Sequence, residues 1–279
     1  IGIGIGFAYV PALAAVQRWF VTWRGLASGL ATAGIGFGTA LVPAATGAVA
    51  ATTDWRVALL AAGAAAIPLG VAGALLLSSS PESRGLLPDG LAATGDRPAP
   101  GAPLDGADFP AVLQERGFWL LYAGTLLVSL PVALPFAHLA QTAQDAGLSA
   151  TQALSLLGIV GIASIAGRCA CGAVADEIGR PLAFIACCAA IALLMPVWAF
   201  ARTEQAFFGY AVGFGVAYGG FVALLPAFAT DRFGRRAASS IIGMLYTSRG
   251  IALLAGAPLM AALLDWTGGR AVPLAGAAL

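Results

Sequence analysis

One arginine inside a long apolar run limits what this chain can fold into. From Ala146 to Ala175 the only formally charged residue is Arg168, and a polar turn that begins at Asp176 closes the run. Helical rise places Arg168 about 12 Å from Asp176, well inside a hydrocarbon layer ~30 Å thick. A guanidinium at that depth costs about 2.5–3.5 kcal/mol on insertion scales, so it has to face a partner or a watery cavity. Arg168 is therefore either a structural arginine bonded to nearby carbonyls or part of an anion-binding site.

The composition indicates an all-α membrane protein. Hydrophobic residues make up 59% of the 279 positions and charged residues only 10%, which is too little charge to cover the surface of a soluble domain. Long charge-free runs fit helices better than the weak alternation of a membrane β-barrel. They predict eight full transmembrane helices and part of a ninth, at residues 1–17, 25–53, 57–81, 117–144, 148–175, 181–201, 205–230, 237–264 and from 271 onward. Both chain ends fall inside apolar runs, so we expect a fragment truncated at both ends.

A proline-rich polar stretch, residues 78–116, divides the predicted helices into two groups. Such a composition is typical of a linker, which leaves residues 1–77 and 117–279 as two helical bundles. Nine arginines fall on the linker side of the predicted helices and three on the other side. The positive-inside rule therefore predicts a multi-pass protein of the cell (inner) membrane with a cytoplasmic linker.

Several other classes of function are not expected. The sequence contains no nucleophile with its base, so we do not expect an enzyme. The four cysteines lie in apolar runs, far in sequence from His138, so we expect no metal site and no cofactor. No basic run exceeds Arg235-Arg236, so nothing points to nucleic acid. We expect a monomer whose partners are the lipid bilayer and a small molecule.

A second arginine also falls inside an apolar run. Arg249 lies about 16 Å along its helix from Ala238, a depth comparable to that of Arg168. Two cations at mid-membrane repel each other, and a carboxylate relieves the repulsion by pairing with a guanidinium in a fork-to-fork arrangement. This pair predicts binding of a small organic anion.

Aromatic and titratable residues supply further candidates. Tyr246 lies three residues before Arg249 on nearly the same helix face. Tyr9, Tyr122 and Tyr218 are further candidates to line the cavity, although packing between helices is the more ordinary role for any one of these tyrosines. His138 is the candidate for proton coupling, because its pKa class suits proton handling, against the alternative of an interfacial histidine bonded to backbone.

Three sets of residues carry a resemblance to the major facilitator superfamily. The turn Gly172-x3-Asp176-x2-Gly179-Arg180 resembles the cytoplasmic loop motif of that superfamily, and Asp231 to Arg236 is a partial second copy. More specific resemblances, to the oxalate/formate antiporter and monocarboxylate transporter branch, are Trp19-Phe20-x3-Arg24-Gly25-Leu26-Ala27-x-Gly29 and Gly243-x-Leu245-Tyr246-Thr247-x-Arg249-Gly250.

The resemblance implies a two-bundle transporter that moves its substrate by alternating access. The chain would supply the fourth to eleventh family helices and the start of the twelfth: residues 1–77 would be helices 4 to 6, and residues 117–279 helices 7 to 12. Arg168 matches a substrate-binding basic residue of the eighth helix, and Arg249 stands where the antiporters have a lysine in the eleventh. Ser164 occupies the place of an acid that couples protons in the monocarboxylate transporters. Proton symport by that device is therefore in doubt.

The loop motifs imply gating. We expect Asp176 with Arg180, and Asp231 with Arg235, to hold the cytoplasmic side shut, helped by the tight turns at Gly172 and Gly179. The sequence thus predicts a secondary transporter of small organic anions, working by exchange or symport. The alternatives are an exporter of drugs or lipophilic cations with the same fold, and a membrane sensor that transports nothing.

Overall fold

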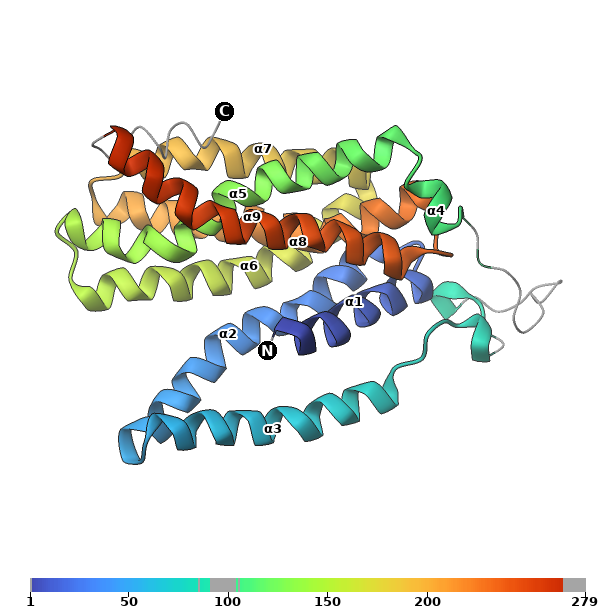
Figure 1. The fold of residues 1–279 in the computed structure, drawn as a ribbon, viewed down its shortest axis with the longest axis horizontal. Coiled ribbons are helices and arrows are strands. Elements are labelled where there is room, and N and C mark those ends of the chain that lie inside the picture. Colours follow the sequence, from blue (N-terminus) through green and yellow to red (C-terminus); the bar gives the residue numbers. More distant parts are fainter. Residues whose placement is uncertain (1, 85, 91–103, 105, 268–279) are drawn as a thin grey trace.

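The computed structural model describes residues 2–84, 86–90, 104 and 106–267 of this all-α protein (Figure 1). Its long helices are α1 (Gly2–Trp19), α2 (Arg24–Thr52), α3 (Trp55–Leu76), α5 (Arg116–Asp145), α6 (Ala150–Ile178), α7 (Arg180–Ala199), α8 (Glu204–Phe233) and α9 (Ala238–Thr267). Between α3 and α5 lie the short helices η1 (Glu82–Arg84), η2 (Pro88–Gly90) and α4 (Phe109–Val112). Successive long helices run antiparallel, so the α1–α2, α6–α7 and α8–α9 turns gather at one end with the described residues between α3 and α5 (Figure 1). We call this the linker end.

Local sequence explains where several helices begin and end. Ser149 and Gln152 form a reciprocal capping box at the start of α6, and the Thr203 side chain caps α8. Gly179, with φ of 100°, and Gly234, with φ of 88°, end α6 and α8 in a backbone conformation that other residues rarely adopt. Both turns lie at the linker end, where α7 and α9 then begin.

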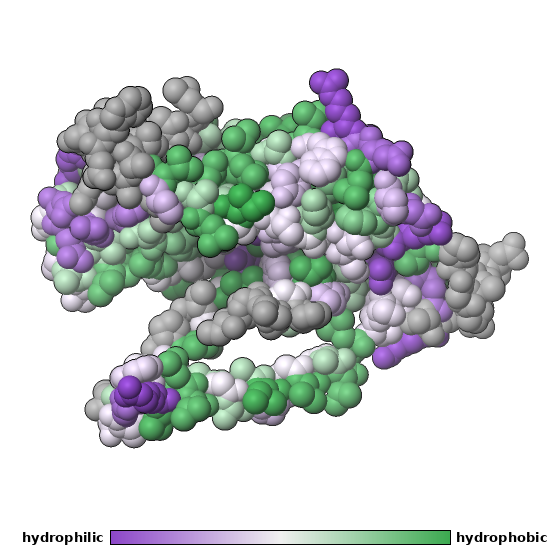
Figure 2. All heavy atoms as spheres, viewed as in Figure 1, coloured by the Kyte–Doolittle hydropathy of each residue, from purple (hydrophilic) through white to green (hydrophobic). Residues whose placement is uncertain are grey.

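Six helical segments of the described chain are long and apolar enough to cross a membrane: α3, α5, α6, α7, α8 and Ala238–Gly256 of α9. Together with α1 and α2 they account for the eight predicted helices, while the predicted ninth, from Ala271, lies outside the described residues. Figure 2 shows hydrophobic side chains along the middle of the molecule and hydrophilic ones gathered toward its two ends. This distribution suits a protein that crosses a bilayer.

The C-terminal bundle, α5 to α9, is built around α8. Helix α8 packs against α6, α7 and α9, and its buried side chains include Phe207, Phe214 and Phe221. The Phe184 ring of α7 stacks on Phe221, with ring centroids 5.6 Å apart. Helices α1 and α2 pack on this bundle through α6, α8 and α9, whereas α3 packs mainly on α2 and stands apart in Figure 1. Leu76 of α3 is 82% exposed, as expected of an apolar side chain whose medium is not water but lipid or further helices.

Helices α2 and α6 cross in direct backbone contact near the linker end. A Cβ atom added at Gly25 would lie 2.5 Å from the Gly172 carbonyl oxygen, and one at Gly172 would lie 2.5 Å from the Gly25 carbonyl oxygen. A Cβ at Gly29 would likewise strike the backbone of Arg168. Small residues permit this approach, which dispersion and weak polar contacts then stabilise in lipid.

The predicted linker is more ordered at its two ends than its composition suggested. Val112 of α4 is fully buried in the core of the C-terminal bundle, and the Glu82 side chain is also buried. The central part of the predicted linker, residues 91–103, lies outside the described residues. Composition does not reveal which few side chains of the linker find partners on the bundles, and the assignment of 78–116 as the linker between two bundles stays a prediction.

Candidate functional site

Arg168 is buried in α6 and bonded to the other group of helices. Its side chain is among the largest that the described fold encloses, with 2% of the residue exposed. One Nη donates a hydrogen bond to the main-chain carbonyl of Thr32 on α2, while the buried Nε has no hydrogen-bond partner. A structural role therefore accounts for the bond between the Arg168 Nη and the Thr32 carbonyl. It does not account for Nε, which remains as a donor for a ligand.

Arg249 of α9 lies among aromatic rings. Its guanidinium carbon is 5.1 Å from the centroid of the Tyr246 ring and 5.5 Å from that of Phe221. Such contacts stabilise a cation without neutralising it. Arg249 and Arg168 are close enough for their charges to repel each other. In the part of the chain that the structure describes, neither arginine forms an ion pair with a carboxylate.

The structure brings the predicted Tyr9 and Tyr246 to this pair. The Tyr9 hydroxyl of α1 lies 3.0 Å from the Tyr246 hydroxyl of α9, and the two rings meet edge to face. Tyr122 lies elsewhere: its hydroxyl is 3.0 Å from Oγ1 of Thr247, and its ring packs on Phe118. Arg168, Arg249, Tyr9 and Tyr246 therefore form one cluster that spans the interface between the two groups of helices. We call it the arginine cluster.

Sequence reasoning missed two contributors to the arginine cluster, Phe221 and the main chain of Thr32, and named Tyr218 only as one of the tyrosines that could line the cavity. The ring of Phe221 packs under Arg249, and Tyr218, one turn earlier on α8, interacts electrostatically with both arginines. Their spacing of three residues is a signal that could have placed them on one helix face. The contribution of Thr32 is its main-chain carbonyl, which the residue type does not reveal.

His138 occupies the second half of α5. Its main-chain carbonyl accepts a hydrogen bond from the Thr142 hydroxyl, and its buried Nε2 has no hydrogen-bond partner. No contact with the arginine cluster is found for it among the described residues. Its role in proton coupling stays a prediction.

At the linker end, Asp176 of α6 binds the first turn of α2 across the interface between the two groups of helices. The two carboxylate oxygens of Asp176, at the end of α6, accept hydrogen bonds from the amides of Gly25 and Leu26, each 3.0 Å long. These amides belong to the first turn of α2, where a negative charge is stabilised by free donors and by the helix dipole. Asp176 also pairs with Arg180 at 2.8 Å, as predicted. One carboxylate thus joins α6, α7 and α2.

Arg180 and Asp231 extend this contact. Arg180 donates to the carbonyls of Val21 and Thr22 in the α1–α2 turn, at 3.0 and 2.8 Å, and pairs with Asp231 at 2.7 Å. Asp231 also pairs with Arg24, the first residue of α2. The predicted pair of Asp231 with Arg235 is therefore wrong. Arg235 pairs instead with Glu82, because the chain turns at Gly234 and carries Arg235 away from the end of α8. Its role in gating stays a proposal.

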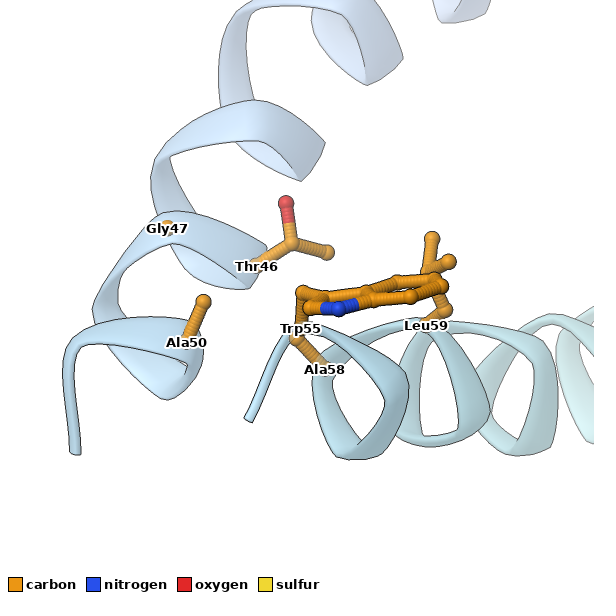
Figure 3. Close-up of a pocket in the computed structure, with 6 residues that line it drawn as sticks. All are labelled: Thr46, Gly47, Ala50, Trp55, Ala58 and Leu59. Carbon is orange, nitrogen blue, oxygen red and sulfur yellow. The ribbon is translucent and has the colours of Figure 1, made fainter. Parts of the chain in front are cut away.

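A cavity of about 340 Å³ lies away from these charges, between the end of α2 and the start of α3. Figure 3 shows the flat Trp55 ring beside Thr46, with Leu59 next to it on α3. Gly47, Ala50 and Ala58 complete the lining, which carries no charge. The Thr46 hydroxyl bonds to the Val42 carbonyl of its own helix. This cavity does not have the chemistry of an anion site.

The comparison with protein families settles the class of the chain. The profile of the Major Facilitator Superfamily matches residues 1–257. The chain belongs to the Major Facilitator Superfamily. Relatives within this superfamily that match the chain are named as transporters.

Individual superfamily members are similar to the chain at modest identity. Human monocarboxylate transporter 11 is 32% identical over 65% of this chain and 36% of its own length, and zebrafish (Danio rerio) monocarboxylate transporter 12-B is 30% identical over 96% of this chain and 60% of its own. The fujikurins efflux protein of Gibberella fujikuroi is 28% identical over 81% of this chain and 45% of its own. The chain thus spans about a third to three fifths of the length of these relatives.

Proposed function

We propose that this superfamily member is a secondary transporter of small organic anions, with Arg168 and Arg249 as the residues that bind the substrate carboxylate. The observation that carries the proposal is a pair of arginines inside apolar helices, Arg168 buried and Arg249 half-buried, that repel each other and have no carboxylate partner among the described residues. Similarity to proteins named monocarboxylate transporters supports the same class of substrate. A monocarboxylate neutralises one arginine, and a dicarboxylate both.

Substrate binding at Arg168 would neutralise a charge at the interface between the two groups of helices. A carboxylate that pairs with the free Nε and the adjacent Nη2 uses the side of the guanidinium opposite Nη1, whose bond to the Thr32 carbonyl stays in place. Binding therefore reduces the repulsion between the arginines while the contact between α6 and α2 is kept. An empty site keeps its repulsion and resists closure around the arginines, which favours movement of the loaded transporter and hence exchange.

The linker end is the cytoplasmic end in this proposal, with residues 78–116 as the cytoplasmic connection. The excess of arginine on that side supports the assignment. The contacts of Asp176, Arg180 and Asp231 then form a cytoplasmic gate that is closed in the described conformation. Gly172 and Gly179 serve this gate, Gly172 by allowing α2 to touch α6 and Gly179 by turning the chain into α7.

A second candidate is export out of the cell, which the similarity to an efflux protein favours. Export fits the same anion site, since direction is set by gradients and not by the arginines. Lipophilic cations are poor candidates, because Arg168 and Arg249 would repel them. His138 would be the residue that couples protons, since position 164 of α6 is a serine and supplies no carboxylate for that role.

Uptake of labelled mono- and dicarboxylates into proteoliposomes that contain the full-length protein tests the proposal. Arg168→Ala should abolish uptake. Arg168→Lys should leave weak residual uptake, because an ammonium group cannot form the bidentate pair that a guanidinium forms with a carboxylate. Arg202→Ala is the matched control, since Arg202 binds the carbonyls of Ala199 and Ala201 at the end of α7 and should leave uptake intact. Wild-type carboxylate uptake by Arg168→Ala, or uptake of cationic dyes alone, would refute the anion site.

A further inference from the structure

The first part of the linker lies across both groups of helices at the linker end. We call residues 78–90 the clamp segment; residue 85 within it is not described. The Trp19 indole of α1 donates to the Ser78 carbonyl at 2.9 Å. At the other end of the segment, the Asp89 carboxylate accepts from the amides of Val21 and Thr22 and from the Thr22 hydroxyl, at 3.0, 2.9 and 3.0 Å. The clamp segment therefore holds α1 and the α1–α2 turn at two points.

The backbone of Asp89 supports the significance of this contact. Its φ of 60° is the one positive value outside glycine in the described chain. That conformation costs free energy for a residue with a Cβ, although aspartate tolerates it better than most. The geometry aims the carboxylate at the same turn whose carbonyls bind Arg180. The α1–α2 turn is thus held through its amides by the clamp segment and through its carbonyls by the C-terminal bundle.

Glu82 joins the clamp segment to the C-terminal bundle. Its carboxylate lies 3.0 Å from Arg235 in the α8–α9 turn, and both side chains are largely buried. Arg235 in turn donates to the Arg18 carbonyl at the end of α1, at 3.3 Å. Glu82 also attracts the Arg18 side chain, which Arg235 repels. Glu82 is therefore the shared counter-ion of two arginines that belong to different groups of helices.

This arrangement has a direct mechanical consequence. With Glu82 in place, Arg18 and Arg235 can stay close as the two groups of helices meet. Without its charge, the clamp segment loses its ion pair with Arg235, and Glu82 no longer offsets the repulsion between Arg18 and Arg235, which weakens the contact between the two groups. We propose that the clamp segment is a latch that holds the linker end closed. In this latch Glu82 is the shared counter-ion, and Asp89 binds the amides of the α1–α2 turn. The latch does not depend on which substrate the arginine cluster binds.

A cysteine reporter at the contact between α1 and α9 tests the latch without any substrate. Ala238, the first residue of α9, is 1% exposed and packs in a small buried cluster with Ala14 of α1. In Ala238→Cys full-length protein, labelling by a water-soluble maleimide at this position, followed by mass spectrometry, reports how often the linker end opens. Glu82→Gln should raise the labelling rate about fivefold or more, which corresponds to ~1 kcal/mol. Asp89→Asn should raise it in the same direction.

Two further variants make the test specific. Glu115→Gln is the matched control: Glu115 pairs with Arg232 at 3.6 Å, but both residues flank helices of the C-terminal bundle and should not affect opening. Arg18→Gln combined with Glu82→Gln should return labelling toward the starting rate, because the repulsion is gone, and this double variant also covers a Glu82→Gln protein that does not fold.

Labelling unchanged in Glu82→Gln and Asp89→Asn, or raised equally by Glu115→Gln, would overturn the latch. A double variant as open as Glu82→Gln would overturn the shared counter-ion. Each outcome can occur with or without carboxylate transport, so failure of the latch is distinct from failure of the anion site.

Discussion

Replacing Asp176 by asparagine should open the linker end of the transporter. The carboxylate accepts amide hydrogen bonds from Gly25 and Leu26 and pairs with Arg180, and its side chain is 3% exposed. A hydrogen bond to a charged group contributes about 1.5–3 kcal/mol, and asparagine keeps one acceptor oxygen but no charge. A loss of about 2–3 kcal/mol from the closed conformation would raise the open population by roughly 30- to 150-fold.

The Ala238→Cys reporter measures this shift directly. Asp176→Asn should increase maleimide labelling at the linker end by well over tenfold and should slow exchange, because the closed state is depleted. Asp54→Asn is the matched control: the exposed Asp54 side chain pairs with the exposed Arg56, at 3.4 Å, in the α2–α3 turn at the far end of the helices. Labelling within twofold of the starting rate in a folded Asp176→Asn protein would refute the assignment of Asp176 as a gate across the interface.

Three other perturbations test separate parts of the structure. Gly172→Val should abolish uptake in proteoliposomes, since its side chain would strike the α2 backbone, whereas Gly158→Val, on the same helix with open space around it, should not. Partial burial alone would raise the pKa of Asp89, but its hydrogen bonds to the α1–α2 turn hold that pKa below the usual value for an aspartate. The contact should therefore persist above the usual aspartate pKa and be lost as pH falls through the lower, folded-state pKa, which hydrogen exchange of the turn amides would measure. Tyr9→Phe removes the cross-interface bond to Tyr246, worth about 1 kcal/mol, and should weaken carboxylate binding by up to about fivefold in a calorimetric titration.

The helices and their order could be predicted from the sequence because each depends on a continuous run of residues. Charge-free length, the turn at Gly179 and the spacing of Asp176 and Arg180 all act locally, and the structure has them as expected. The position of Arg168 inside a long helix, before the polar turn that ends it, also followed from counting residues.

Contacts between distant segments could not be predicted in the same way. The partners of Asp231 and Glu82 lie far away in the chain, and charge alone does not choose among many arginines. The bond from Arg168 ends on a main-chain carbonyl of α2, which has no signature in residue type. Tyr122 has the right residue type on the right helix, but its ring packs on Phe118 and its hydroxyl bonds to Thr247 instead of joining the arginine cluster.

Carboxylate binding to purified full-length protein tests the central claim most directly. A titration that follows the melting temperature with mono- and dicarboxylates should show stabilisation of the wild-type protein. Arg168→Gln combined with Arg249→Gln should show none, while Arg202→Gln should match the wild type. Equal stabilisation of the double variant by the same carboxylates would contradict an anion site built on these two arginines.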